Sequence, residues 1–236
     1  MPTLLLGDRK PDLVELMDRE DCDLDRLNET YRQFDLLNRL LSGWGGIYRR
    51  SIRPRLEGGS ATLLDVGCGG GDVARFLALL AARDELHLAI TGIDPDQRAI
   101  DFARGAGPKS GRRALPAIEW IACHTSQLIQ EERQFDFVIS NHVLHHLTQE
   151  ALQGLLSDSE SLATHACLHN DICRDDLAMA GFQIVSLPFR GSFIRPDGLM
   201  SIRKSYTRRE LASVVPMGWT AQRRIPFRLL ATWTAS

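Results

Sequence analysis

The sequence predicts an α/β fold in which helices cover both faces of a mostly parallel sheet. In LLDVGCGGGDVARFLA, residues 63–78, a short apolar run is followed by a glycine-dense turn and an apolar helical pattern. A buried strand, a tight turn and a helix account for that order. Two comparable units follow, AITGIDPDQRAIDFAR at 89–104 and QFDFVISNHVLHHL at 134–147. Strands that alternate with helical patterns in this way are typical of a parallel sheet.

The composition fits one globular α/β domain with additional segments. The chain has 236 residues, of which 44% are hydrophobic and 25% are charged. The formal net charge of −2 gives no electrostatic drive toward nucleic acid. The first apolar run has only three leucines, which is too short for a signal peptide, and no run approaches a membrane span. The five cysteines lack C-x-x-C spacing and suit reduced thiols. We therefore expect a cytoplasmic protein with no membrane span and no nucleic-acid partner.

The glycine turn from Gly67 to Gly71 is the first candidate site. Glycines let the backbone turn sharply and approach a ligand, and the helix after the turn directs its free N–H groups toward it. A dinucleotide fingerprint needs glycine at the sixth position of G-x-G-x-x-G, but counted from Gly67 that position holds Asp72. Asp65 would repel a pyrophosphate and attract an ammonium or a sulfonium. An ordinary strand–turn–helix connection stays open as the alternative.

Polar residues also end the following strands. Asp94 ends the second strand, where an acid commonly accepts hydrogen bonds from ribose hydroxyls. Ser140, Asn141 and His142 end the fourth strand. Together these segments resemble class I S-adenosylmethionine-dependent methyltransferases over residues 60–147. The resemblance implies a Rossmann-like fold with a seven-stranded, mostly parallel sheet. It also implies S-adenosyl-L-methionine as cofactor and S-adenosyl-L-homocysteine as product, with no metal.

The resemblance assigns cofactor binding to residues at the ends of the first four strands. These residues are Asp65, Gly67, Cys68, Gly69, Asp94, Pro95, His124, Thr125, Asn141 and His142. Members of this family usually carry an acid at the position of His124, where it accepts from the adenine amino group. Thr125 or a backbone group is therefore expected to substitute.

The region before the first strand is predicted to be helical over residues 11–56. Apolar side chains recur at steps of three and four, which is one face of a helix; they are Leu24, Leu27, Tyr31, Phe34, Leu37 and Leu41. Asp23 is the expected N-cap and Gly43 the expected C-cap. The block YRQFDLLNRLLSGWGGIYRR resembles the N-terminal region of ubiquinone- and menaquinone-biosynthesis C-methyltransferases, which closes over the active site. That resemblance implies a helical lid over residues 1–59, with Tyr31 at the substrate. A helix packed on the sheet edge is the alternative.

The remaining elements follow from the same patterns. The expected strands cover 62–66, 87–93, 117–122, 135–141, 164–171, 218–225 and 227–234, and the expected helices cover 71–82, 96–104, 148–163 and 207–215. Residues 105–116 are a loop on composition. In the family that the core resembles, the last strand is antiparallel and lies beside strand five. The methyltransferase domain is thus expected to span 60–236.

Residues 172–206 do not fit the minimal fold, and we predict an insertion that caps the substrate. The stretch FRGSFIRPDGLMSIRKSYT is expected to be a loop. N-D-x-x-R followed by D-G-x-x-S-x-R-x-x-Y-T resembles small-molecule methyltransferases associated with type III polyketide synthases, whose acceptors are phenolic lipids or related polyketides. The resemblance singles out Asn170, Asp171, Arg174, Asp197, Ser201, Arg203 and Tyr206. It implies that Asn170, Arg203 and Tyr206 bind the substrate. A loop that pairs its own charges is the alternative.

The histidines of HVLHH lie just after strand four. Metal ligation is one interpretation, but no Asp, Glu or Cys in this stretch supplies a further ligand, so no metal is expected. A structural hydrogen bond to the turn is the second. In the third, His145 or His146 is the general base that accepts the proton of a phenol. Asp171 would orient that base, and Arg174 would attract the developing oxyanion.

These observations predict an enzyme that transfers a methyl group from S-adenosylmethionine to the hydroxyl of a small acceptor, phenolic or polyketide-derived. Two alternatives stay open. A C-methyltransferase acting on a quinone precursor is favoured by the D-L-L-N-R-L-L-S run. A non-catalytic S-adenosylmethionine-binding accessory protein is favoured by His124, which replaces the usual acid.

Overall fold

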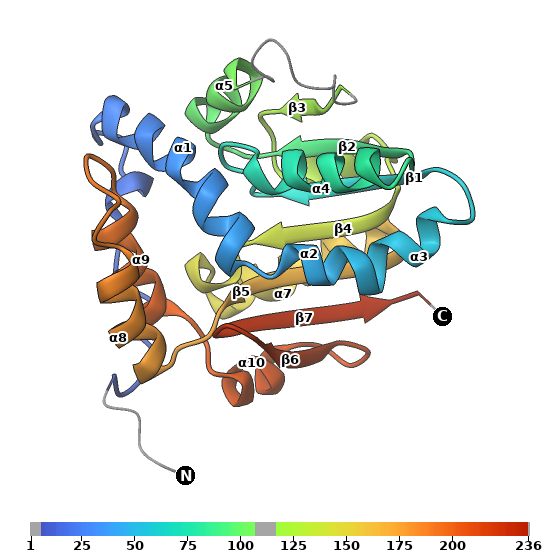
Figure 1. Ribbon diagram of the computed structural model, residues 1–236. Helices are drawn as coiled ribbons and strands as arrows, with labels where there is room; N and C mark the ends of the chain where they lie inside the picture. The colour runs from blue at the N-terminus through green and yellow to red at the C-terminus, as the bar shows by residue number, and fades with distance from the viewer. Residues whose placement is uncertain (1–5, 107–116, 236) are drawn as a thin grey trace.

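The computed structural model describes residues 6–106 and 117–235. Within these residues, seven strands form one sheet of order β3-β2-β1-β4-β5-β7-β6 (Figure 1). The strands are β1 (Ala61–Val66), β2 (Leu88–Ile93), β3 (Glu119–Ile121), β4 (Phe135–Asn141), β5 (Ala163–Ile172), β6 (Thr220–Arg224) and β7 (Arg228–Thr234). The first five are parallel, and β7 runs antiparallel between β5 and β6. The predicted seven-stranded, mostly parallel sheet is confirmed, with its last strand beside strand five.

Helices cover both faces of this sheet. They are α1 (Leu24–Leu41), α2 (Trp44–Ile47), α3 (Arg53–Leu56), α4 (Asp72–Arg83), α5 (Gln97–Gly105), α6 (Thr125–Gln130), α7 (Gln149–Leu162), α8 (Asp176–Val185), α9 (Ile194–Lys204) and α10 (Arg208–Val214). Short turns of helix lie at η1 (Leu16–Asp18), η2 (Tyr48–Ile52) and η3 (Leu144–His146). From residue 107 on, the predicted loop at 105–116 lies outside the described residues. None of the helices described is long and apolar enough to span a membrane.

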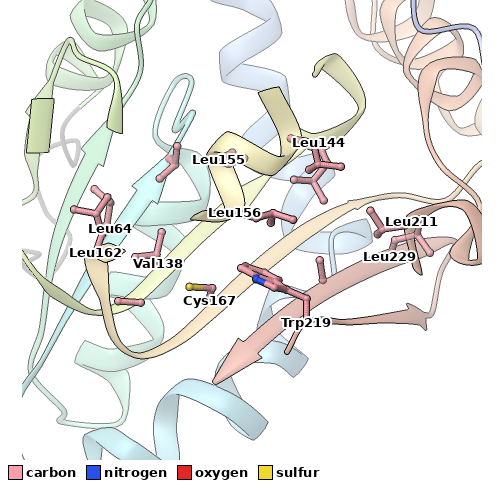
Figure 2. Close-up of a cluster of buried hydrophobic side chains, with 14 of the residues drawn as sticks. Leu64, Val138, Leu144, Leu155, Leu156, Leu162, Cys167, Leu211, Trp219 and Leu229 are labelled. Atoms are coloured by element: carbon pink, nitrogen blue, oxygen red, sulfur yellow. The ribbon is translucent and has the colours of Figure 1, made fainter. Parts of the chain in front are cut away.

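The apolar runs of the strands are explained by burial on both faces. Leu63 and Leu64 are both fully buried, yet they belong to different clusters, because successive side chains of a strand point to opposite faces. Figure 2 shows the Leu64 side, where α7 packs against the sheet. Its labelled members are Leu64, Val138, Leu144, Leu155, Leu156, Leu162, Cys167, Leu211, Trp219 and Leu229. On the other face, Leu63 packs with α4.

The region before β1 divides into two parts. α1 begins at its predicted N-cap, since Asp23 accepts a hydrogen bond from the backbone N–H of Arg26 at 3.0 Å. Ser42 ends the helix, and Gly43 follows with φ of 78°, the left-handed conformation expected after a helix. The segment beyond it is core, because four of its large side chains are buried in the α4-side cluster. These are Trp44, Tyr48, Ile52 and Leu56.

The prediction of a loop at 189–207 is wrong, because this segment contains α9. Pro196 and Gly198 obscured the helical pattern. Pro196 lies in the first turn, where its missing N–H leaves no intrahelical bond unmade. Gly198 allows α9 to approach α8 closely, since a Cβ there would lie 2.3 Å from the ring of Phe182. Figure 1 shows α9 beside α1 and α8 beside α9, beyond the carboxyl ends of the parallel strands.

Candidate active site

A cavity of about 410 Å³ lies at the carboxyl ends of β1, β2 and β4. The glycine turn forms one end of it. Residues of η1, α1, η3, α8 and α9 form the other. In open parallel sheets, ligands bind at these strand ends.

The glycine turn adopts a left-handed backbone that residues with a side chain adopt only rarely. Gly67 has φ of 66°, and a Cβ there would lie 2.6 Å from Val143. Gly71 has φ of 76°, and a Cβ there would lie 2.3 Å from the ring of Trp120. The turn therefore needs glycine both for its left-handed conformation and for its close packing.

Replacing Gly71 with alanine is expected to destabilise the fold by about 1–3 kcal/mol. The added methyl group meets Trp120, and the left-handed backbone is strained for alanine. Thermal denaturation measures this loss, at roughly 2–4 °C of melting temperature per kcal/mol. Gly154→Ala is the matched control. It lies within α7 with no atom within 4 Å of its Cβ position, so the melting temperature should stay unchanged or rise. Equal melting temperatures for the parent and Gly71→Ala would contradict the assignment of strain.

Two acids define the turn end of the cavity. Asp65 is 1% exposed, and neither of its carboxylate oxygens has a hydrogen-bond partner among the described residues. Burial, together with the charges of Asp72 and Asp94, raises the pKa of Asp65 well above its usual range. Asp94 accepts from the backbone N–H of Gly69 and from that of Asp96, both at 2.9 Å. Asp94 therefore ties the end of β2 to the glycine turn.

Helix α1 also contacts the turn end of the cavity. The amide of Asn38 donates a hydrogen bond to Asp72 at 2.8 Å, which connects α1 to the first residue of α4. Tyr31, Phe34 and Leu37 of the same helix also line the cavity. These contacts bring α1 to the carboxyl ends of the strands, and its predicted role as a lid stays a prediction.

The end of β4 is held by a buried arginine. The guanidinium of Arg228 donates to the Asn141 side chain and to Nε2 of His142, both at 2.9 Å. Because guanidinium only donates, Nε2 of His142 must be the accepting nitrogen. Burial and the charge of Arg228 lower the pKa of His142 well below its usual range, so this ring is neutral. Asn141 and His142 both line the cavity.

His145 is the central polar group of the other end. Its Nδ1 lies 2.7 Å from Oδ1 of Asp171, and its backbone N–H donates to Oδ2 of the same carboxylate at 2.8 Å. Asp171 thus fixes the imidazole, whose Nε2 is buried without a hydrogen-bond partner among the described residues. Burial alone would lower the pKa of His145, but Asp171 and Glu15 outweigh burial and raise this pKa to about 9.

The N-terminal segment supplies a carboxylate that the sequence did not indicate. Oε1 of Glu15 lies 3.3 Å from Nε2 of His145, 3.7 Å from Nε2 of His146 and 3.5 Å from the ammonium of Lys204. Nδ1 of His146 in turn lies 3.1 Å from Asp18. Burial would raise the pKa of Glu15, but these neighbouring groups lower it to about 2, so Glu15 is ionised.

Glu15, His145 and His146 bring three potential metal ligands within 4.8 Å of one another. The absence of a further ligand was the reason for expecting no metal, and Glu15 supplies one. The ammonium of Lys204, however, already lies beside this carboxylate, 3.5 Å away. An ion pair therefore accounts for the cluster as it stands.

Most of the predicted cofactor residues line the cavity. They are Asp65, Gly67, Cys68, Gly69, Asp94, Pro95, Asn141 and His142. His124 and Thr125 do not line it. His124 is exposed, and the hydroxyl of Thr125 donates to Asp158. These two residues follow a strand of only three residues and turn away into α6.

Among the predicted catalytic residues, His145 and His146 line the cavity, and Asp171 supports His145. The structure does not place Arg174 there. Its buried guanidinium donates to the backbone oxygens of Gly7 and Ser205 and pairs with Glu210. Its donors are therefore engaged with structural partners.

The predicted substrate residues separate in the same way. Tyr31 lines the cavity, whereas Asn170 lies beneath it and donates to the backbone oxygen of Ser42 at 2.8 Å. Arg203 is exposed on α9. Tyr206 lies under the guanidinium of Arg9, 3.9 Å from its ring centroid. The cavity wall is instead completed by apolar residues that the sequence did not single out, namely Met17, Ile172, Phe182, Phe193 and Ile194.

A known protein family matches the central part of this chain. Residues 64–167 match a family model described as a methyltransferase domain. The ubiquinone biosynthesis O-methyltransferase of Methylocella silvestris is 37% identical over 107 residues, which cover 45% of this chain and 37% of that protein. The demethylmenaquinone methyltransferase of Thermotoga maritima is 34% identical over 116 residues, covering 48% and 44%. The chain thus spans less than half the length of these curated relatives.

Solved structures match over a longer part of the chain. The magnesium protoporphyrin IX methyltransferase of Synechocystis PCC 6803, with bound SAH, has a TM-score of 0.52 at 16% identity, covering 90% of this chain and 86% of that one. A plantazolicin methyltransferase in complex with SAH has a TM-score of 0.59 at 12% identity, covering 90% and 95%. At such identities the likeness shows a shared fold. The chain therefore has the class I methyltransferase fold, as predicted, and its residues 64–167 are similar to a methyltransferase domain.

Proposed function

We propose that this chain transfers a methyl group from S-adenosylmethionine to the hydroxyl of a small aromatic acceptor. The observation that carries the proposal is the charge of the cavity wall. Seven carboxylate side chains line it, and no lysine or arginine does so among the described residues; the acids are Glu15, Asp18, Asp65, Asp72, Asp94, Asp96 and Asp197. Such a wall disfavours a pyrophosphate and favours a ligand that carries positive charge.

The residues at the turn end fit S-adenosylmethionine. The buried carboxylate of Asp65 lacks a partner and would be stabilised by a cationic ligand. Asp94, at the end of β2, is placed to accept from ribose hydroxyls. When bound, the cofactor supplies a methyl group already activated by its sulfonium. The chain then has to hold donor and acceptor in line, and such positioning can contribute several kcal/mol.

The acceptor would lie between the aromatic wall and His145. Tyr31, Phe34 and Phe193 offer flat apolar surfaces that suit an aromatic ring. His145 lines the cavity, and Asp171 holds its ring. After losing its own proton, His145 can accept the hydroxyl proton, with His146 as the neighbouring alternative. We propose that η1, α1 and the 172–206 insertion cover this acceptor, because all three supply cavity-lining residues.

If His145 is the base, turnover should rise with pH toward a midpoint near its pKa of about 9. The protonated imidazole has no lone pair with which to accept a proton. As pH rises through that pKa, the protonated fraction of His145 falls and activity rises. The pH–rate profile at saturating acceptor measures this. The acceptor should be a hydroxyl compound so weakly acidic that it stays protonated throughout the range, so that its own titration does not contribute and its proton has to be removed by a base. A flat profile with such an acceptor would contradict a histidine base.

Release of S-adenosylhomocysteine with phenols, resorcinols and hydroxyquinones as acceptors tests the proposed reaction. We expect turnover with at least one of them and a methyl ether as product, identified by NMR. A product methylated on carbon would instead support methylation of a quinone precursor, which the similarity to a demethylmenaquinone methyltransferase favours. Cofactor binding without turnover on any acceptor would support an accessory role.

A further inference from the structure

We propose that Glu15, carried by the N-terminal segment ahead of α1, is a positioning residue that holds the proton on His145 and so sets the pH range in which the acceptor site works. This inference rests on the proposed function, because it assigns the role of a base to His145. It concerns a residue outside the matched methyltransferase domain, which spans 64–167.

Glu15 is built into the site. Its side chain is 4% exposed, and Oε1 accepts a hydrogen bond from the hydroxyl of Ser201 on α9 at 2.9 Å. The two residues after it, Leu16 and Met17, donate their backbone N–H groups to the two carboxylate oxygens of Asp197, each at 2.9 Å. The carboxylate and the two residues after it are thus fixed to α9.

A second attachment connects this segment to the cofactor side. The guanidinium of Arg98 donates to the backbone oxygen of Arg19 at 3.0 Å and pairs with Asp96, which lines the cavity. The place of Glu15 is therefore determined from both ends of the site.

Both ring nitrogens of His145 face carboxylates. Nδ1 lies 2.7 Å from Asp171, and Nε2 lies 3.3 Å from Glu15. An imidazole between two carboxylates is stabilised in its doubly protonated form. The Glu15 contact is an ion pair, and Nε2 has no hydrogen-bond partner among the described residues.

The other groups around His145 do not replace Glu15. His142 is neutral, 6.3 Å away between ring centroids, and the His146 ring lies at 4.1 Å. Arg9 donates to the backbone oxygen of His145 and leaves its ring free. Lys204 opposes protonation, but its ammonium lies against Glu15 and His146. The remaining charged groups nearby are Asp18, which pairs with His146, and Asp197, which binds the N-terminal segment.

Removing the charge of Glu15 should therefore make His145 a base at lower pH. Glu15→Gln keeps the shape of the side chain and removes one of the two carboxylates. A nearby opposite charge shifts a pKa by about 1–3 units, so the titration midpoint of His145 should fall by roughly one to two pH units. Turnover near neutral pH should then equal or exceed that of the parent, a result that a purely structural role would not produce.

The direct measurement is the NMR titration of His145 in the protein saturated with S-adenosylhomocysteine, with the signal assigned by its loss in His145→Gln. Glu20→Gln is the matched control, because Glu20 is exposed on the same segment. In this variant the titration midpoint of His145 should equal that in the parent. Lys204→Met provides an independent variant with the opposite sign. It removes a nearby positive charge, so the midpoint of His145 should rise.

The proposal is overturned if His145 titrates at the same pH in Glu15→Gln and in the parent, or if the midpoint falls in Lys204→Met. It is also overturned if excess EDTA shifts the parent's midpoint, because a bound metal would then explain the cluster. This titration requires no acceptor and no turnover. Failure of the proposed function would instead appear as absence of S-adenosylhomocysteine binding or release.

Discussion

Replacing His145 with glutamine is expected to lower turnover by about 10²–10⁴-fold, with the affinity for S-adenosylhomocysteine largely retained. Glutamine can still donate a hydrogen bond to the acceptor, but it cannot accept the hydroxyl proton. His145 lies at the end of the cavity away from the glycine turn, and its partner Asp171 does not line the cavity. The substitution should therefore leave the turn end intact. Single-turnover kinetics at saturating cofactor, together with calorimetric affinity, separate the two effects.

His146→Gln is the matched control for this substitution. Its side chain is 29% exposed, and Nδ1 lies beside Asp18 and Lys204, so we expect a loss below about tenfold. If His146→Gln lowers turnover more than His145→Gln does, His146 is the base and His145 is not. If neither variant slows turnover tenfold, catalysis by positioning alone explains the data better, and the histidine-base mechanism is dropped.

Replacing Asp94 with asparagine is expected to weaken S-adenosylhomocysteine binding by about 10–10³-fold. A hydrogen bond to a charged acceptor contributes roughly 1.5–3 kcal/mol, and the ribose offers two hydroxyls. The substitution should also lower the stability of the free protein, because one oxygen that accepts from Gly69 or Asp96 becomes an NH₂ group. The melting temperature should therefore fall along with the affinity.

Calorimetric titration of the variant with S-adenosylhomocysteine measures this loss. Asp101→Asn is a suitable control, because Asp101 is an exposed acid on α5 that accepts a hydrogen bond from the amide of Gln97. Its affinity should match that of the parent. Equal affinity for Asp94→Asn and the parent would show that the ribose assignment is wrong.

The sheet and the turn end of the site could be predicted because their signals are local. Each strand of the core is a short apolar run that ends in a polar residue. Asp65, Gly67 and Asp94 follow such runs directly and therefore meet at one edge of the sheet. The predicted antiparallel position of the last strand is likewise confirmed.

The acceptor end depends on contacts between distant segments, which no local pattern records. Glu15 lies in residues 11–23, which were predicted to be helical and instead contain only the short turn η1 before α1 begins at Leu24. It meets His145 because Asp197 binds that segment. Arg174 also binds residues that are distant in the chain, namely Gly7 and Glu210. Its buried structural role was therefore not visible from N-D-x-x-R. α9 was missed because proline and glycine are poor helix formers in general but fit their particular positions here.

The most direct test of the account is calorimetric titration of the parent protein with S-adenosylhomocysteine, with NADH in a parallel titration. The carboxylate-lined cavity and the partnerless Asp65 predict saturable binding of S-adenosylhomocysteine at one site per chain, and no binding of the pyrophosphate-containing NADH. A folded parent that gives no heat with S-adenosylhomocysteine, or that binds NADH in its place, would contradict the central claim.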